Sequence, residues 1–500
     1  MSSDQQDQLP LFAVIDLGSN SFHMLITRLV ADSVQVVDKV KRKVRLASGL
    51  NDKNHLSEDV ILRGLECLSF FTERLQDIPD SNIRIVATAT LRIATNAQDF
   101  LQRAEKILKR KITLLSGTEE AENIYLGVAH TNCSAAQRLV LDIGGASTEI
   151  IVGEAFKTKK VLSLDIGCVS FNQKFFNDSQ LSNDSFLQAL SEAKTIISPH
   201  VNAYTAIGWQ SVLGGSGTMQ ALAEILMVQK KPAIITLNLL KNLQQQLISF
   251  KKTSAIDIDG LSTERVPVFA SGLIILRALF ECFAITQLQL SSGALREGLL
   301  YEMLPSMRDL NIRQRTISSL SQRFHIDTCH ASRVAKQGAA LYKALSPMWA
   351  MTDDNAEQLL SASCALHEIG LLLEYKHHPK HGAYIIQQAD LPGFEQAERQ
   401  LLSVLIGLYK ADIDIKQIHA QCAYPFEQAC RLLAILRLAV ILCKRRRDDV
   451  LPAYSAKIVN NTIHLCIPKT WLDQHPLIED ELKQEHGFLQ VMNLSLTIDC

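Results

Sequence analysis

Two stretches of the chain share one pattern: residues 14–26 read VIDLGSNSFHMLI and residues 140–152 read VLDIGGASTEIIV. Each runs from apolar residues through Asp and Gly to small polar residues, and then becomes apolar again. A short apolar run that stops at Gly and resumes at once predicts a β-hairpin. When the stretches are superposed, the matched pairs are Asp16 with Asp142, Gly18 with Gly144 and Ser21 with Ser147. The repeat predicts two related lobes that contain the same acidic turn.

The chain length and the rhythm of its segments predict several domains. Five hundred residues exceed what one hydrophobic core usually holds. Strand-like and helix-like stretches alternate after the first hairpin and again after the second, whereas residues 309–447 have helical periodicity and few glycines. We therefore predict an α/β protein with an α-helical domain and a small α+β module. The expected parts are residues 11–128, 129–308, 309–450 and 451–500.

The composition excludes several classes of protein. The 51 basic and 52 acidic residues nearly cancel, which argues against a protein that coats nucleic acid. The 11 cysteines form no CxxC pair, as expected for reduced thiols in the cytosol. Residues 268–285 are the most apolar segment, but Arg277 and Glu281 interrupt it, so we predict a buried helix rather than a membrane span. We expect a cytoplasmic protein with no nucleic-acid or membrane partner.

The repeated turn is suited to binding phosphate. A strand that ends in Asp and turns on Gly-Ser presents backbone N–H groups and hydroxyls around a small concavity, which binds phosphate oxygens. A single copy is often only a structural turn, but two copies facing each other would clamp a chain of phosphates from both sides. The expected phosphate-binding residues are Asp16, Gly18, Ser19, Asn20 and Ser21 in the first turn, and Gly144, Gly145 and Ser147 in the second.

This arrangement resembles the actin-like ATPase superfamily, in which two ribonuclease-H-like lobes close on phosphates. Within it, the chain is most similar to the exopolyphosphatase / guanosine pentaphosphate phosphohydrolase family, over essentially its whole length. The motifs that carry the resemblance are DLGSNSFHMLI (16–26), SGTEEAENIYLGV (116–128), DIGGASTE (142–149), LGGSGTMQAL (213–222) and LSSGALREGLLYEML (290–304). KRKVRLASGL (41–50) and VATATLR (86–92) look more like the guanosine pentaphosphate phosphohydrolases.

The resemblance implies roles for three acidic residues. Glu119, Glu120 and Glu122 are expected in the first turn of a helix, where acids also simply compensate the helix dipole. The resemblance implies that Glu120 is the general base that activates the attacking water. It also implies that Asp142 and Glu149 organise Mg²⁺, while the alternative for Glu149 is a solvent-facing strand position. His23 stands where the first repeat would match Glu149, so we expect the chemistry to depend on the second lobe.

Basic and glycine residues complete the predicted site. The resemblance implies that Arg92 contacts phosphate, the alternative being a surface salt bridge, and that Gly215 and Gly217 lie in a further phosphate-binding loop. Four cations alternate along a predicted strand and so would share one face, beside the phosphates or merely in solvent. They are Lys39, Lys41, Lys43 and Arg45. Asp165, in a partial third copy of the turn, is expected to be structural.

The C-terminal half resembles a phosphohydrolase domain of the His-Asp (HD-like) type. His367 and Glu368 are expected in a helix, with His377, His378 and His381 shortly after. The adjacent Asp of such domains is replaced by Glu368, and the segment 331–345 before it contains no histidine. We therefore predict a degenerate, non-catalytic domain that serves substrate channelling or dimer contacts. The basic run 444–447 would line such a channel or form a solvated face.

Taken with the motifs, the resemblance implies an Mg²⁺-dependent hydrolase. The expected reaction removes the terminal 5′-phosphate of guanosine pentaphosphate (pppGpp) to give ppGpp, with inorganic polyphosphate as a further substrate, in a homodimer. One alternative is a processive exopolyphosphatase. An actin-like ATPase or sugar kinase is disfavoured because no acceptor-binding Asp is recognisable. A non-catalytic alarmone sensor is also disfavoured, because a phosphate binder gains nothing from acids beside the anion.

Overall fold

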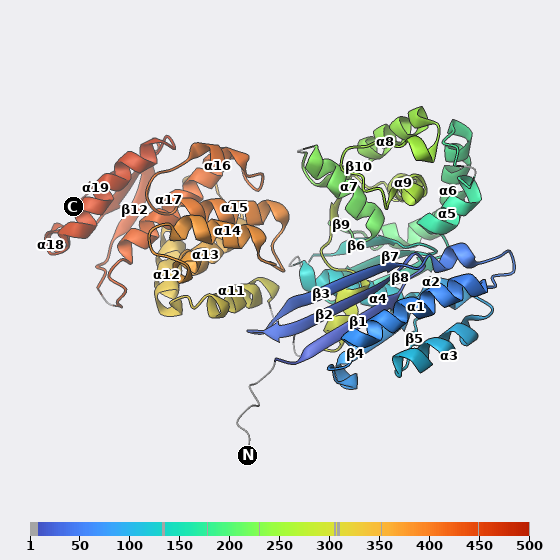
Figure 1. Cartoon of the computed structure of the whole chain (residues 1–500). Coiled ribbons are helices and arrows are strands. Elements are labelled where there is room, and N and C mark those ends of the chain that lie inside the picture. The colour runs from blue at the N-terminus through green and yellow to red at the C-terminus, as the bar shows by residue number, and fades with distance from the viewer. Residues whose placement is uncertain are drawn as a thin grey trace, which may run out of the picture. The chain divides into compact units, whose positions relative to one another are not determined.

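The computed structural model describes residues 9–132, 136–177, 179–229, 231–304, 307, 311–351, 353–448 and 450–499 (Figure 1). Two compact units divide the chain: residues 1–29 with 34–310, and residues 30–33 with 311–500. Three hydrophobic clusters fill the first unit, and one fills the second.

The first sheet is built around the first of the repeated hairpins. Its strand order is β3-β2-β1-β4-β5, with β1 antiparallel to β2 and parallel to β4, and with β4 parallel to β5. The side chains of β1 alternate between two hydrophobic clusters, which explains why its sequence is almost uninterruptedly apolar. The strands are β1 Leu11–Leu17, β2 Ser21–Val30, β3 Ser33–Lys43, β4 Ile83–Ala87 and β5 Thr113–Leu114.

The second sheet repeats this order. Strands β8-β7-β6-β9-β11 correspond to β3-β2-β1-β4-β5, and β10 is added antiparallel to β11 at the edge. Again the first hairpin, β6–β7, is antiparallel, and β6 runs parallel to β9. This confirms the predicted pair of ribonuclease-H-like lobes. The strands are β6 Arg138–Ile143, β7 Thr148–Glu154, β8 Lys157–Leu164, β9 Ser211–Gly214, β10 Ile234–Thr236 and β11 Gln287–Leu290.

Two helices, α4 Gly117–Thr131 and α10 Leu295–Glu302, pack in the core that the two sheets share. That core includes Val14 and Val140, from the central strands of the two sheets. The helices touch backbone to backbone, since a Cβ at Gly298 would meet the Asn123 carbonyl oxygen at 1.7 Å. The remaining helices of this unit are α1 Glu58–Arg74, α2 Ala89–Ile93, α3 Ala97–Leu108, α5 Cys168–Phe175, α6 Asn183–Thr205, α7 Gly217–Val228, α8 Leu237–Phe250 and α9 Val266–Cys282.

The most apolar segment forms α9, whose side chains are largely buried in the second lobe. Arg277 Nε donates to Glu281 Oε1 at 2.8 Å, so the two charges that interrupt the apolar run neutralise each other on one side of the helix. Within the described ranges, no helix is both long and apolar enough to cross a membrane.

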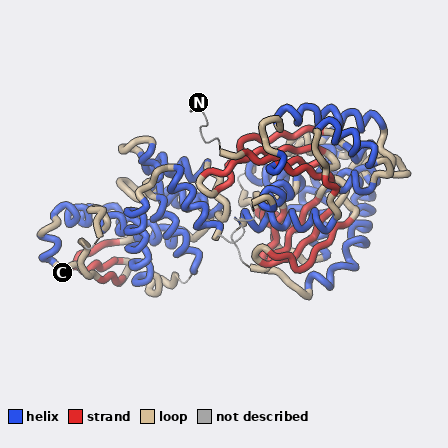
Figure 2. Tube along the Cα trace, turned by 90° about the horizontal axis from the view of Figure 1, so that it is seen from below, coloured by secondary structure: helices blue, strands red, loops and turns tan. Residues whose placement is uncertain are grey.

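In the C-terminal unit, a small sheet lies among helices (Figure 2). The sheet has three strands and shares one hydrophobic cluster with the helices. A buried ion pair ties α17 to α19, with Arg437 Nε 2.6 Å from Glu485 Oε1. The helices are α11 Ile312–Arg323, α12 Thr328–Leu345, α13 Asp354–Leu366, α14 His378–Gln388, α15 Gln396–Leu408, α16 Ile415–Ala420, α17 Phe426–Leu442, α18 Lys469–Asp473 and α19 Pro476–Gln490. The strands are β12 Ser455–Val459, β13 Thr462–Cys466 and β14 Ser495–Asp499.

Candidate active site

The two repeated turns are equivalent in register but different in chemistry. In the first hairpin Asp16 lies opposite His23, and in the second Asp142 lies opposite Glu149. Both turns follow the carboxyl end of a central strand, the edge where ligands bind in sheets of this kind. Of the two hairpins, only the second places two carboxylates side by side, so a dependence of the chemistry on the second lobe stays a prediction.

The two turns also meet in space. A Cβ built on Gly145 would lie 2.8 Å from the Cβ of Ser19 and 3.5 Å from the backbone nitrogen of Asn20. Only a glycine allows the second turn to approach the first this closely. Residues far apart in the sequence are therefore brought together in the arrangement that the repeat predicted.

Four acids surround these turns, burial raises the pKa of each, and the charge of Glu120 adds to the rise at the other three. Burial, followed by the charge of Glu120, raises the pKa of Asp142 to about 7. Burial likewise raises the pKa of Asp16 to about 7, against the opposing charge of Arg296. Burial and the charges of Glu120 and Asp142 raise the pKa of Glu149 well above its usual value. A group of carboxylates that resist ionising together is suited to binding a cation.

Two polar atoms at the first turn lack a hydrogen-bond partner within the described chain. Asp16 Oδ1 and Ser21 Oγ, on either side of the turn, are both buried and unpaired. Buried polar atoms are normally satisfied, so unpaired ones in one place are typical of a site that binds a polar ligand.

The structure separates the roles of the predicted helix acids. Glu119 forms a capping box with Ser116, its carboxylate accepting from the Ser116 N–H at 2.8 Å. Glu120 instead is buried and accepts a hydrogen bond from Arg92 Nη1 at 2.7 Å. Burial raises the pKa of Glu120, while the bond to Arg92 opposes that rise. Glu122 lies beyond the first turn of α4, so its predicted place there was wrong.

Glu149 is buried, which rules out the solvent-facing alternative for it, whereas Arg92 is partly buried and forms an ion pair with Glu120. Arg92 lies in the short helix α2 rather than in a loop, and it also donates to the Leu115 carbonyl at 3.0 Å. Glu149 is only 1% exposed and accepts a hydrogen bond from Ser163 Oγ at 2.8 Å. Asp165, by contrast, is exposed directly after β8, in keeping with a structural position.

Two arginines that the sequence analysis did not single out also lie at the site. Arg296, on α10, donates to His23 Nδ1 at 3.0 Å. Burial and the charge of Arg296 lower the pKa of His23 to about 3, so this imidazole is neutral. Arg265 lies against Gly217, where a Cβ would come within 1.8 Å of its guanidinium. Gly217 therefore makes room for a cation, and its loop neighbour Gly215 lies beside Asp142, with a Cβ 3.8 Å from Asp142 Oδ2.

The predicted cationic stripe is only partly formed. Lys41 and Lys43 both lie 3.7 Å from Glu264, and burial followed by the charge of Arg265 lowers the pKa of Lys41. Lys39 is exposed on the same strand. Arg45 follows β3 with a φ of 55°, so the prediction that it continues the strand alternation was wrong.

The C-terminal unit corrects the prediction for its histidines. His367 ends α13 and Glu368 follows it, so neither lies inside a helix. His330, in the first turn of α12, lies near both residues, so the upstream helix does contain the histidine that the sequence analysis missed. His378 contacts the Tyr409 hydroxyl at 2.5 Å, whereas His381 pairs with Glu374 at the surface.

The basic run 444–447 is largely engaged in local contacts. Lys444 pairs with Glu481, Arg445 with His475 Nε2 at 2.8 Å, and Arg446 with Asp327 and Glu368. These contacts hold the loop after α17 against neighbouring elements of its own unit. Lys444 and Arg446 pair with carboxylates, whereas Arg445 contacts an imidazole, so the run keeps positive charge at the surface.

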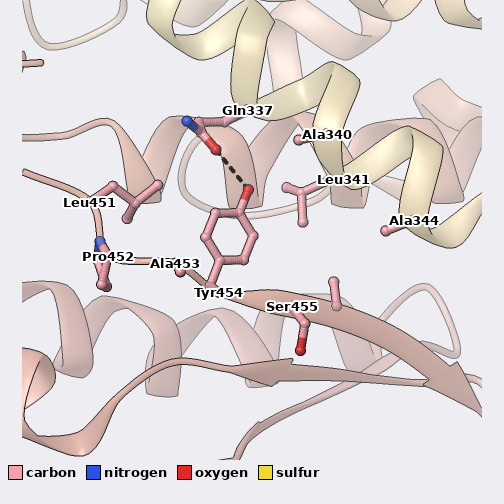
Figure 3. Close-up of a pocket in the computed structure, with 10 residues that line it drawn as sticks. Gln337, Ala340, Leu341, Ala344, Leu451, Pro452, Ala453, Tyr454 and Ser455 are labelled. Atoms are coloured by element: carbon pink, nitrogen blue, oxygen red, sulfur yellow. Dashed lines mark hydrogen bonds between the residues drawn. The ribbon is translucent and has the colours of Figure 1, made fainter. Parts of the chain in front are cut away.

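A groove of about 510 Å³ lies between α12 and the segment that leads into β12 (Figure 3). Small and aliphatic side chains line it, and Tyr454 donates a hydrogen bond to Gln337 Oε1 at 2.7 Å across it. No charged residue is among its lining residues, so it is unsuited to a phosphate substrate.

The duplicated ribonuclease-H-like lobes, with acids around two facing turns, give the first unit the fold of the actin-like ATPases. The family model of the Ppx/GppA phosphatases matches residues 25–307, and that of domain III of the same phosphatases matches residues 312–486. The chain belongs to the Ppx/GppA phosphatase family and is therefore an enzyme of the phosphatase type, which confirms the resemblance found in the motifs.

Relatives named guanosine-5′-triphosphate,3′-diphosphate pyrophosphatase are similar over nearly the whole chain. The protein of Photobacterium profundum is 47% identical over 476 residues, 95% of each chain. That of Pseudoalteromonas translucida is 46% identical over 478 residues, 96% of each. The crystal structure of an exopolyphosphatase from Cytophaga hutchinsonii has a TM-score of 0.54 at 24% identity, covering 59% of this chain and 98% of that one. The last comparison supports the fold alone.

The raised pKa of Asp16 predicts how stability depends on pH. A carboxyl whose pKa is higher in the folded than in the unfolded chain favours folding while it is protonated. The contribution of protonated Asp16 to the free energy of unfolding is complete below about pH 4 and is lost as the pH rises through about 7. We therefore expect Asp16→Asn to stabilise the metal-free protein by about 1–4 kcal/mol at pH 8 but hardly at pH 4. Urea unfolding in EDTA at both pH values measures this, and an equal effect at both would contradict it.

Proposed function

We propose that this chain hydrolyses the terminal phosphoanhydride bond of pppGpp, giving ppGpp and inorganic phosphate. The observation that carries the proposal is the buried group of Glu120, Asp142 and Glu149 beside two facing phosphate-type turns. The names of relatives at 46–47% identity over almost the full chain support the choice of nucleotide. A phosphate-binding sensor would not need three acids in this position.

In this proposal Glu120 is the general base. It lies in the first turn of α4, its charge acts on Asp16 and Asp142, and burial raises its pKa, which makes its carboxylate a better proton acceptor than an exposed one. Arg92 orients the Glu120 carboxylate through the bond at 2.7 Å and adds positive charge near the phosphates. Positioning and charge neutralisation supply most of the rate acceleration in phosphoryl transfer, so no covalent intermediate is required.

Asp142 and Glu149 would hold Mg²⁺. They are opposite each other on β6 and β7, the charge of Asp142 helps to raise the pKa of Glu149, and carboxylate oxygens are the ligands that Mg²⁺ prefers. Bound there, Mg²⁺ supplies neutralisation of phosphate charge. The backbone N–H groups of the turns after β1 and β6 then bind the phosphate oxygens from two sides. Arg265 and Arg296 add fixed positive charge beside these turns.

Phosphate release from three substrates tests this function. The purified chain with Mg²⁺ is given pppGpp, long-chain polyphosphate or ATP, and kcat/KM is compared. We expect pppGpp to be preferred by at least about tenfold. Preference for polyphosphate that increases with chain length would instead indicate a processive exopolyphosphatase. Binding of pppGpp without phosphate release would indicate a sensor and would overturn the catalytic roles.

We also propose that the enzyme is a cytoplasmic homodimer. The cysteines of the described chain are free, as expected in a reducing compartment. The resemblance of the helical domain to that of the long family members supports dimer contacts there. Light scattering coupled to gel filtration should give twice the chain mass of 55.6 kDa, and a mass of one chain would contradict it.

A further inference from the structure

A second group of potential ligands lies in the C-terminal unit and takes no part in the proposed reaction. His330, His367 and Glu368 each offer a ligand atom, and these atoms lie within 4.8 Å of one another. The Nε2 atoms of both histidines are 4.0 Å from the same oxygen, Glu368 Oε1. The three side chains come from the start of α12 and the end of α13, so the fold brings them together.

The histidines are buried and prepared to donate a lone pair. His330 is 2% exposed and His367 is 1% exposed. His367 Nδ1 lies 2.8 Å from the Cys364 carbonyl oxygen, which fixes the proton on Nδ1, and Nε2 has no hydrogen-bond partner. Metal-binding histidines typically have this arrangement, with one ring nitrogen held by a carbonyl and the other free. Burial lowers the pKa of His367 to about 4, so its ring is neutral at pH 7.

A guanidinium competes for the carboxylate of this group. Arg446 donates to Glu368 Oε1 and lies 3.3 Å from Asp327 Oδ2. The Arg446 side chain is 42% exposed and belongs to the loop after α17, whereas the Glu368 side chain is 10% exposed. The cation that neutralises Glu368 is therefore the one component of the group that can move into solvent.

We propose that His330, His367 and Glu368 bind one divalent transition-metal ion of the Zn²⁺ or Co²⁺ kind, in competition with Arg446. Two imidazoles and one carboxylate favour such ions, while Mg²⁺ prefers oxygen ligands throughout. The site differs in ligand chemistry and in unit from the acids around Asp142. A bound ion would connect the start of α12 to the end of α13 and replace the ion pair of Arg446 with Glu368.

Titration of the full-length chain with Co²⁺, in the presence of Mg²⁺, tests the proposal by calorimetry and by the visible absorption of bound Co²⁺. We expect one site whose absorption indicates nitrogen ligands. Arg446→Ala should tighten binding at least tenfold, because it removes the competing cation. This gain cannot arise from misfolding, so it keeps the test decisive if a loss variant is unstable.

Loss variants and a matched control complete the test. Glu368→Gln and His330→Ala should each weaken Co²⁺ binding at least tenfold, while thermal unfolding checks that they remain folded. His381→Ala should change nothing, because that histidine pairs with Glu374 at the surface. The proposal is overturned if Co²⁺ binds neither the wild type nor Arg446→Ala, or if His381→Ala weakens binding as much as His330→Ala does.

Discussion

Replacing Glu120 with Gln is expected to lower kcat for pppGpp by about 10²–10⁴-fold, the range that general-base catalysis supplies. The amide keeps the size of the carboxylate and can still accept the hydrogen bond from Arg92, but it cannot accept a proton from water. KM should change little, because the phosphates are bound mainly by the turns. Steady-state phosphate release at saturating Mg²⁺ measures both constants.

The neighbouring Glu119 offers a matched control. It is exposed, caps α4, and would keep its hydrogen bond to the Ser116 N–H as Gln. We therefore expect Glu119→Gln to retain almost all activity. Equal losses in the two variants would show that the helix start, rather than the Glu120 carboxylate, is responsible. An active Glu120→Gln enzyme would remove the proposed base.

Replacing Asp142 with Asn should lower kcat/KM by at least about 100-fold and raise the Mg²⁺ concentration needed for half-maximal rate. The loss follows because neutralising phosphate charge with a metal ion contributes several kcal/mol. The variant should fold well, since the pKa of Asp142 is raised by burial and the neutral amide avoids burying a charge. Activity measured over a range of Mg²⁺ concentrations separates weaker metal binding from slower chemistry.

Asp165→Asn is the control for Asp142. Asp165 is the Asp of the partial third copy of the turn, and it is exposed. Its replacement should therefore alter neither the rate nor the Mg²⁺ dependence. If Asp142→Asn reached the wild-type rate without needing more Mg²⁺, Asp142 would not be a metal ligand. Partial rescue by excess Mg²⁺ would support the proposed role.

Local signals account for the parts of the fold that the sequence predicted. Gly18 and Gly144 interrupt apolar runs, so both hairpins and their register could be anticipated from period and turn chemistry. The same signals placed Ser116 and the acids after it at the start of a helix. They could not distinguish Glu119 from Glu120, because which residue faces the interior depends on how α4 packs between the sheets.

Residues that reach the site from distant elements were harder to predict. Arg265 and Arg296 lie at or near helix starts in the second lobe, and nothing in their local sequence shows that they approach Gly217 and His23. Arg296 lies within a quoted motif, so a count of cations near glycine loops could have found it. His330 was missed because its helix begins earlier than expected, at Thr328.

The backbone contact between α4 and α10 limits how far these two helices can move relative to each other. A Cβ at Gly127 would come within 2.1 Å of the Ala294 carbonyl oxygen, so the two helices cannot separate or slide without losing close packing. Glu120 lies in the first turn of α4, and Arg296 lies in the first turn of α10. The carboxylate of Glu120 and the guanidinium of Arg296 are therefore carried by one rigid helix pair, which fixes the spacing of the helix positions from which the two charges extend.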